Sequence, residues 1–321
     1  MLNIKTPSAA SRLEPPETSP APPPGSAAGS LVDLMLRWVG HQRWIRYGLR
    51  ERLLRALRHP EHCGTAAFEV PFAGYAYPGR KNRWIDWIVY YYGAYEQDEL
   101  ETMRSLVAGR PAVALDIGAN VGHHSLYMAS FCAQVHAFEP YEKVACAIDN
   151  KIRRNGLRHV HVHRVGLSDQ ERVLDFYAPQ GVNTGTGSFV ATHEVQNNCL
   201  VGQLRVVKAD DYIASLQLQR IDLVKIDVEG FELSVLRGLP ETLRRHRPIV
   251  MLELSDEARQ SLPSMAALMA LFPPGYRAEV VHSRQARWML FGRTGCALHP
   301  LQWHHRPLPG GYVNLLLRPG A

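Results

Sequence analysis

The chain has 321 residues, with 36 basic and 30 acidic side chains and a formal net charge of +6. Hydrophobic residues make up 46% of it, enough for one large domain with appendages or two small ones. The five cysteines are widely spaced and form no CxxC pair, so we expect neither a metal site of the zinc type nor a disulfide framework. The modest positive charge permits an anionic substrate or partner and does not indicate nucleic-acid binding.

Residues 1–30 are rich in Pro, Ala and Ser and poor in large apolar side chains, which predicts a disordered tail. They contain no apolar core of the kind that a signal peptide needs. No apolar run long enough for a transmembrane helix occurs in the chain. We therefore expect a cytoplasmic protein.

Residues 31–58 combine apolar and basic side chains at helical spacing. The apolar residues recur mostly every three or four positions, at Leu31, Met35, Trp38, Ile45, Leu49, Leu53 and Leu57. Arginines fill much of the rest, at Arg37, Arg43, Arg46, Arg50, Arg52, Arg55 and Arg58. The pattern predicts a basic amphipathic helix, interrupted near Gly40. It either packs on the domain with a solvated arginine face or docks on an anionic membrane or a partner protein.

An aromatic segment follows, from Trp84 to Tyr92, and an acidic helix-like segment runs on to Leu106. Aromatic side chains in such a run are more often core than ligand contacts. We expect residues 31–110 to form a helical and aromatic N-terminal extension.

From Ala112 onward, strand-like and helix-like segments alternate. The predicted main strands are 112–117, 134–138, 159–165, 221–226 and 248–252, with additional short ones at 173–177 and 204–207 and late ones at 276–282 and 312–317. The predicted helices are 121–131, 141–155 and 231–244. This alternation predicts a doubly wound α/β domain with a mostly parallel sheet over residues 111–321.

A glycine-containing turn joins the first of these strands to the first helix, with the sequence LDIGANVG from Leu115 to Gly122. Gly118 and Gly122 let the backbone turn sharply and approach a ligand closely. A dinucleotide fold would place a pyrophosphate here, but the carboxylate of Asp116 repels phosphate and suits a cationic ligand. The turn therefore favours S-adenosylmethionine over NAD.

Further acidic residues follow the next two strands. Glu139 comes after the second strand, where a carboxylate can accept hydrogen bonds from ribose hydroxyls in either cofactor. Ser168 and Asp169 follow the third strand, where Asp169 either accepts from the adenine amino group or serves as a turn residue.

A cluster of ionisable residues follows the buried strand 221–226. Lys225, Asp227 and Glu229 lie there, with Glu232 just beyond Gly230. Asp227 or Glu229 is placed to take a proton from a substrate hydroxyl, and Lys225 to stabilise negative charge. The alternatives are a divalent metal site, or carboxylates that only cap the next helix. Glu253, His123 and His124 are further candidates.

Together these segments resemble the FkbM family of methyltransferases, a group of Rossmann-like enzymes that use S-adenosylmethionine. The resemblance covers about residues 90–255 and rests on several blocks in the family's order: Gly93–Glu96, Leu115–Gly122, Ala137–Pro140, Asn150, Gly166–Asp169, Lys225–Glu232 and Pro248–Glu253. His123 and His124 depart from the family pattern, and the first 60 residues have no counterpart in it.

The resemblance implies methyl transfer to oxygen on a small molecule, sugar or lipid-linked glycan. It implies that Asp116, Gly118, Asn120 and Gly122 hold the donor's methionine half and that Glu96 is also a cofactor-binding residue. Glu139 would hold its ribose, with Ser168 and Asp169 on the adenine side. Two other classes stay open: an NAD-linked oxidoreductase and a non-catalytic protein that binds S-adenosylmethionine. Nucleic-acid methylation is disfavoured, because the chain has no Asn/Asp-Pro-Pro-Tyr/Phe motif after the fourth strand.

Overall fold

The computed structural model describes residues 31–179, 187–190, 198–284, 295–301, 303 and 311–320. The expectation of a disordered tail over residues 1–30 lies outside these ranges. None of the helices in them is long and apolar enough to cross a membrane.

A sheet of eight strands organises the described part of the chain, in the order β12-β11-β13-β10-β9-β3-β4-β5. Its strands are β3 (Ala112–Ile117), β4 (Cys132–Phe138), β5 (Val160–His163), β9 (Leu223–Ile226), β10 (Ile249–Ser255), β11 (Tyr276–Arg284), β12 (Gly295–Pro300) and β13 (Tyr312–Pro319). From β10 to β5 all neighbours are parallel, whereas β13, β11 and β12 are added antiparallel. The mostly parallel sheet is confirmed.

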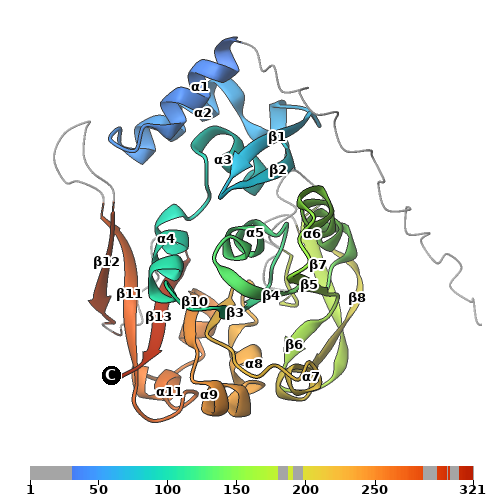
Figure 1. Ribbon diagram of the computed structural model, residues 1–321, viewed down its shortest axis with the longest axis vertical. Helices are drawn as coiled ribbons and strands as arrows, with labels where there is room; N and C mark the ends of the chain where they lie inside the picture. Colours follow the sequence, from blue (N-terminus) through green and yellow to red (C-terminus); the bar gives the residue numbers. More distant parts are fainter. Residues whose placement is uncertain are drawn as a thin grey trace, which may run out of the picture.

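Helices cover both faces of this sheet, as a doubly wound fold requires (Figure 1). On the upper side in Figure 1 lie α4 (Gln97–Leu106), α5 (His123–Ala129) and α6 (Glu142–Asn155). On the lower side lie α7 (Ala209–Ser215), α8 (Glu232–Arg237), α9 (Pro240–His246) and α11 (Met265–Met269). The short helix α10 (Asp256–Gln260) follows β10 directly.

The register aligns the carboxyl ends of the parallel strands. Ile117 of β3 pairs with Phe138 of β4 and with Ile226 of β9, and Ile226 also pairs with Leu252 of β10. Residues that follow these four strands therefore meet at one edge, which is where open α/β sheets bind ligands.

A second sheet of three described strands stands beside β5, in the order β6-β8-β7. It comprises β6 (Gly166–Ser168), β7 (Arg172–Pro179) and β8 (Asn198–Lys208). The short strands predicted at 173–177 and 204–207 belong to it and not to the main sheet.

The N-terminal extension packs as two helices, a hairpin and an aromatic helix above the sheet (Figure 1). Its elements are α1 (Leu31–His41), α2 (Tyr47–Arg58), the 3-10 turn η1 (Pro60–His62), β1 (Ala67–Phe72), β2 (Tyr75–Arg80) and α3 (Trp84–Tyr92). The helical segment is interrupted close to Gly40, as predicted, because α1 ends at His41. The aromatic segment is core: Trp87, Tyr90 and Tyr91 are buried.

The extension shares its hydrophobic core with the sheet. One cluster of buried side chains joins Leu36 and Trp87 of the extension to Leu126 and Leu316 of the α/β part. The extension (31–110) and the α/β part (111–321) therefore do not have separate cores, and the domain boundary between them remains a prediction.

One expectation about the elements is wrong, and one hairpin has no counterpart among the predicted elements. The single helix predicted at 231–244 is two helices, because Pro240 starts α9 and Gly238 packs against the backbone of Ser168, where a Cβ atom would lie 2.0 Å from the carbonyl oxygen. The hairpin β1–β2 was not predicted, because Pro71 and Pro78 interrupt the alternation that marks strands.

Candidate active site

The turn after β3 has the backbone geometry that the glycines predict. Gly118, Asn120 and Gly122 all have positive φ, at 84°, 52° and 77°. The amide nitrogens of Gly118 and Ala119 donate to the carbonyl oxygen of Phe138 at the end of β4, which fixes the turn to the neighbouring strand. The turn leads directly into α5, whose N-cap is Gly122.

Gly118 also determines how closely two strand ends approach. A Cβ atom on Gly118 would lie 1.8 Å from the carbonyl oxygen of Asp227, which follows β9. The amide of Asp227 donates to the carbonyl oxygen of Ile117. No side chain fits at position 118 without moving the backbone, so the glycine brings the turn and the ionisable block together.

Glu139 anchors the other side of this turn. Its Oε2 accepts a hydrogen bond from the amide of Asn120 at 3.0 Å, and its Oε1 accepts one from the amide of Tyr141 at 2.8 Å. Burial raises the pKa of Glu139 to about 7, although both backbone bonds oppose the shift. Each carboxylate oxygen keeps a lone pair, which a ligand hydroxyl can use.

A cleft opens beside Gly118 and Glu139, and its other walls are apolar. It is lined by Ile117, Gly118, Phe138, Glu139, Pro140, Val165, Gly166, Leu167, Phe176, Gly187, Phe189, Val228 and Phe231. Phe189 contacts two other aromatic residues of the cleft. Its ring centroid lies 5.0 Å from that of Phe176 and 5.2 Å from that of Phe231. The cleft thus combines aromatic faces for a planar base with one buried carboxylate.

A larger hollow lies at the opposite edge of the sheet, where the parallel strands begin. Its lining includes Arg110, Arg220, Asp222, His246, Arg247 and Arg318. Because ligands of doubly wound sheets bind at the carboxyl ends of strands, we assign the site to the smaller cleft.

Asp116 is completely buried beneath the turn and does not line the cleft. Its Oδ2 accepts a hydrogen bond from the hydroxyl of Ser125 at 2.5 Å, and in the described part of the chain its Oδ1 has no partner. Burial raises its pKa, and the ammonium group of Lys225 opposes that shift. The carboxylate is held in place, with one oxygen left for a donor group.

Ser168 and Asp169 bind each other and a neighbouring arginine. The hydroxyl of Ser168 donates to Oδ1 of Asp169 at 3.0 Å, and Arg172 donates to the same oxygen at 2.9 Å. Neither residue is among those that line the cleft, whereas Gly166 and Leu167 just before them are. Their contact with adenine stays a prediction.

The ionisable residues at the end of β9 form a partly buried network around the buried Lys225. The ammonium nitrogen of Lys225 lies 2.6 Å from Oδ2 of Asp227. Burial by itself would lower the pKa of Lys225, but the carboxylates of Asp227, Glu96 and Asp116 raise it. Lys225 is therefore a permanent cation among acidic groups.

Glu253 joins this network from the end of β10. Asp227, Glu229 and Glu253 can each offer a carboxylate oxygen within 4.8 Å of the others, a spacing that also suits a divalent cation. Burial, and then the charge of Asp227, raises the pKa of Glu229 to about 8. The same causes raise the pKa of Glu253 well above its ordinary value. The site thus contains carboxyl groups that exchange protons near neutral pH.

Glu229 also occupies an unusual backbone position. Its φ is 48°, and its carbonyl oxygen accepts a hydrogen bond of 2.6 Å from the hydroxyl of Ser188. The next glycine, Gly230, donates its amide to Oε1 of Glu232, whose Oε2 accepts from Ser255 at 2.9 Å. Glu232 therefore holds the turn, which leaves the Glu229 side chain for chemistry.

Glu96, His123 and His124 close the site from the N-terminal side. Nε2 of His124 lies 3.3 Å from Oε2 of Glu96, and Nε2 of His123 contacts the carbonyl oxygen of Tyr95 at 2.9 Å. Burial lowers the pKa of both histidines well below the ordinary value, and Lys225 adds to this at His124. Both rings are neutral and weak bases, so the carboxyl groups are better placed to take a proton.

The family description of the methyltransferase FkbM domain matches residues 116–278, half of the chain. The match contains the glycine turn, Glu139, the cleft and the carboxylates Asp116, Asp227, Glu229 and Glu253, whereas Glu96 lies outside it. The chain belongs to the FkbM methyltransferase family. Enzymes of this family use S-adenosylmethionine as the methyl donor.

Three curated relatives of this FkbM-family chain share about 30% sequence identity with it. AMB antimetabolite synthetase AmbE of Pseudomonas aeruginosa is 31% identical over 50% of the chain and 9% of its own length. Hexuronic acid methyltransferase AglP of Haloferax volcanii is 31% identical over 41% of the chain and 52% of its own length. The 2-O-methyltransferase NoeI of Sinorhizobium fredii is 29% identical over 55% of the chain and 81% of its own length. The chain thus covers less than two thirds of AmbE and AglP.

Among solved structures, the methyltransferase FkbM of Methylobacillus flagellatus aligns with a TM-score of 0.40 and 18% identity. The alignment covers 64% of this chain and 43% of that one.

The residues present fit S-adenosylmethionine. The positive φ of Gly118 and its close approach to the backbone of Asp227 shape the turn beside the cleft, and Oδ1 of buried Asp116, which has no hydrogen-bond partner among the described residues, lies beneath it. Aromatic walls and Glu139 suit a nucleoside, and the many carboxylates suit a cationic ligand. Sequence reasoning missed the aromatic walls Phe138, Phe176, Phe189 and Phe231, which come from different elements and share no local pattern.

Proposed function

We propose that this chain transfers a methyl group from S-adenosylmethionine to a hydroxyl oxygen of a small molecule, sugar or glycan. The observation that carries the proposal is the close approach of Gly118 and Asp227, which sets the donor turn directly beside a network of proton-exchanging carboxyl groups. A site that only binds the donor does not require such groups.

In this proposal the donor is held by the residues of the first and second strand ends. Glu96, Asp116, Gly118, Asn120 and Gly122 hold the methionine half, Glu139 binds the ribose, and the adenine lies between the apolar walls on the side of Ser168 and Asp169. When bound, S-adenosylmethionine supplies an electrophilic methyl group on a positively charged sulfur. The carboxylates around it favour that charge over a diphosphate, which argues against the NAD-linked alternative.

The acceptor hydroxyl must lose a proton as its oxygen attacks, and we assign this proton to Glu229. A base with a pKa of about 8 is matched to proton transfer near neutral pH. Asp227 is held by Lys225 and, in our proposal, orients the acceptor together with that cation. Glu253, whose carboxylate oxygen lies within 4.8 Å of that of Glu229, is the second candidate for this role.

A sugar hydroxyl is the acceptor that the relatives favour. The names of AglP and NoeI refer to methylation of a hexuronic acid and to 2-O-methylation. Lys225, buried next to the proposed base, would also attract an acceptor that carries a carboxylate.

The test is methyl transfer from radiolabelled S-adenosylmethionine to a panel of hexuronic acids, neutral sugars and glycan fractions. We expect labelled methyl ethers with the wild-type chain and at least about a hundredfold less label with Glu229→Gln. A parallel fluorescence titration compares S-adenosylhomocysteine with NADH. Binding of NADH alone would reject the proposal, and binding of S-adenosylhomocysteine without transfer to any fraction would favour the non-catalytic class.

A further inference from the structure

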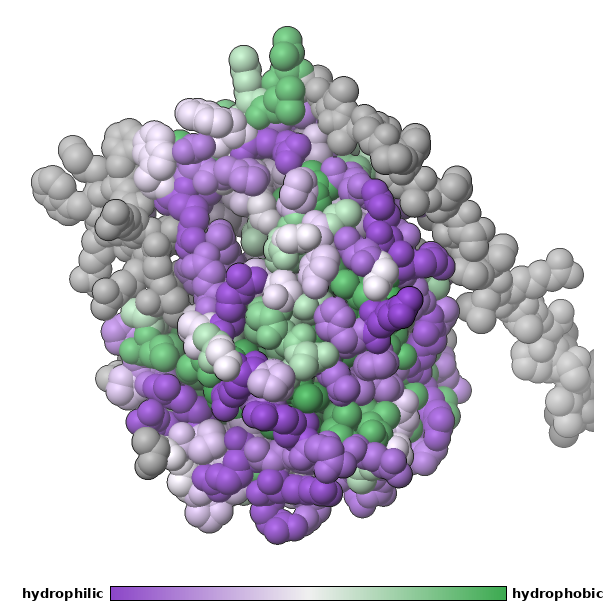
Figure 2. Space-filling view, in the orientation of Figure 1, coloured by the Kyte–Doolittle hydropathy of each residue, from purple (hydrophilic) through white to green (hydrophobic). Residues whose placement is uncertain are grey.

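The two N-terminal helices carry most of the exposed apolar surface of the described chain. Nine of its twelve exposed large hydrophobic side chains lie in α1, α2 and the link between them: Leu31, Val32, Leu34, Met35, Trp38, Trp44, Leu49, Leu53 and Leu57. Leu31, Met35 and Trp38 are exposed by 77%, 67% and 64%. Hydrophobic residues project at the top of Figure 2, where Figure 1 places the beginning of α1. Exposure this concentrated marks an interaction site.

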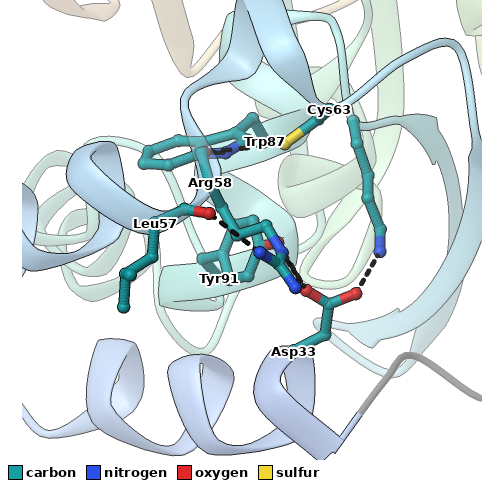
Figure 3. A network of polar contacts seen from close by, with 7 residues as sticks. Asp33, Leu57, Arg58, Cys63, Trp87 and Tyr91 are labelled. Carbon is teal, nitrogen blue, oxygen red and sulfur yellow. Dashed lines mark hydrogen bonds and ion pairs between the residues drawn. The ribbon is translucent and has the colours of Figure 1, made fainter.

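These helices turn polar side chains inward. In α1, Asp33 is buried and accepts hydrogen bonds from Arg58, Lys81 and Tyr91 at 2.9, 3.0 and 3.1 Å. Figure 3 shows Arg58 of α2 and Tyr91 of α3 directed at Asp33 of α1. Burial opposes ionisation of Asp33, but the bonds from Lys81 and Arg58 hold its pKa below the ordinary value. The ion pairs fix the orientation of α1.

The second helix is anchored in the same way. The guanidinium group of Arg50 is buried, donates to the carbonyl oxygen of Gly40 and lies 5.5 Å from the ring centroid of Tyr92. Leu36 and Leu54 are the large apolar residues of α1 and α2 that are buried in the core. The remaining apolar side chains are therefore held outward by the polar contacts, and not by chance fraying of the helices.

The charges between these apolar side chains are positive. Arg46, Arg52 and Arg55 are exposed, and the acidic residues of the segment are both engaged, Asp33 by the network above and Glu51 by Arg55 at 2.8 Å. A second copy of this chain would bring two positive faces together, which disfavours self-association through them. An anionic lipid surface matches both the arginines and the apolar side chains. It also receives projecting Leu, Met and Trp residues without a preformed pocket.

We propose that α1 and α2 dock the protein on an anionic membrane surface, with Leu31, Met35 and Trp38 among the inserted side chains and Arg46 and Arg52 on lipid headgroups. This inference does not rest on the proposed function. A methyltransferase held at a membrane would act on acceptors exposed there, and its activity on a soluble acceptor is independent of docking.

Co-sedimentation of the full chain with lipid vesicles tests the proposal. The probes are vesicles of phosphatidylcholine alone and of phosphatidylcholine mixed with phosphatidylglycerol. We expect binding to the mixed vesicles only, and weaker binding as salt is raised. The variants M35S/W38S and R46E/R52E should each lower the bound fraction about tenfold or more, since each removes a main component of interfacial affinity.

Matched controls separate this surface from general effects. V173S/L200S removes exposed apolar side chains elsewhere, and R237E/R245E reverses exposed arginines on α8 and α9. Both should bind like the wild type, and thermal unfolding should be unchanged in all four variants. The proposal is overturned if the mixed vesicles bind no protein, or if the controls lose binding equally. It is also overturned if light scattering shows a dimer that M35S/W38S dissociates.

Discussion

The ammonium group of Lys225, in β9, lies 2.6 Å from the carboxylate of Asp227, which directly follows that strand beside the Gly118 turn. This partly buried pair places one permanent cation in a site that otherwise gathers negative charge. Burial, and then the charge of Asp227, raises the pKa of the neighbouring Glu229 to about 8. The geometry therefore separates an orienting pair from a proton acceptor, and that separation can be tested.

Replacing Gly118 by Ala should abolish donor binding. The added Cβ atom would lie 1.8 Å from the carbonyl oxygen of Asp227, and Gly118 has a φ of 84°. We expect S-adenosylhomocysteine affinity, measured by calorimetry, to fall by more than about tenfold, or about 1.4 kcal/mol. Gly109→Ala is the control, since Gly109 has a φ of 80° with nothing within 4 Å. Equal losses in both variants would attribute the effect to backbone strain alone.

Replacing Glu229 by Gln should slow turnover and spare the donor. Loss of a general base typically costs about 10²–10⁴-fold in rate. We expect kcat for a hydroxylated acceptor to fall within that range, while S-adenosylhomocysteine affinity changes less than about threefold, because Glu229 lies on the acceptor side in our proposal. The exposed Glu257→Gln is the matched control. Wild-type kcat in the Glu229 variant would remove this residue from the mechanism.

The rate should rise with pH through the titration of Glu229. Burial and the charge of Asp227 raise its pKa to about 8, so the group is protonated and inactive as a base at lower pH. Below that pKa, kcat should increase about tenfold per pH unit and then level off. A profile of kcat from about pH 6 to pH 9 tests this, with the Glu229→Gln variant expected to lose the rise. A rate that decreases across this range contradicts the assignment.

Removal of divalent cations decides between two uses of the same carboxylates. Asp227, Glu229 and Glu253 are close enough to share a cation, but Lys225 already provides positive charge to Asp227. We expect turnover to persist after treatment with EDTA and dialysis. Loss of activity that Mg²⁺ or Mn²⁺ restores would instead assign the three carboxylates to a metal site. The Glu253→Gln variant is treated in parallel. Restoration of activity by Mg²⁺ or Mn²⁺ in the wild type but not in this variant would show that Glu253 is a metal ligand.

Asp33→Asn should loosen α1 without altering methyl transfer to a soluble acceptor. The substitution leaves the charges of Arg58 and Lys81 without their partner, and breaking a partly buried pair costs about 1–3 kcal/mol. The pKa of Asp33 is held below its ordinary value, so this stabilisation is present above the unfolded pKa and is lost as pH falls through the folded pKa. Denaturant unfolding at neutral and acid pH measures both effects. The two proteins should converge in stability at low pH, and a difference that persists there would contradict the role of the ion pairs.

The sequence by itself determined most elements of the α/β part and the kind of site. Ala112–Ile117 is a continuous apolar run followed by glycines, so local propensity and backbone freedom predict the strand, the turn and the helix without any partner. The same holds for the acidic residues at the carboxyl ends of the strands, because alternation of strands and helices already places those ends at one edge.

Only the tertiary structure decided how these groups are used. Glu253 meets Asp227 and Glu229 through the pairing of β9 with β10, and the pKa of Glu229 depends on burial that no local pattern records. Periodicity gave α1 an apolar face, yet the ion pairs of Asp33 with Arg58 and Lys81 turn that face outward. Contacts between distant residues set charge and orientation, since electrostatic energy depends on separation in space and on burial rather than on position along the chain.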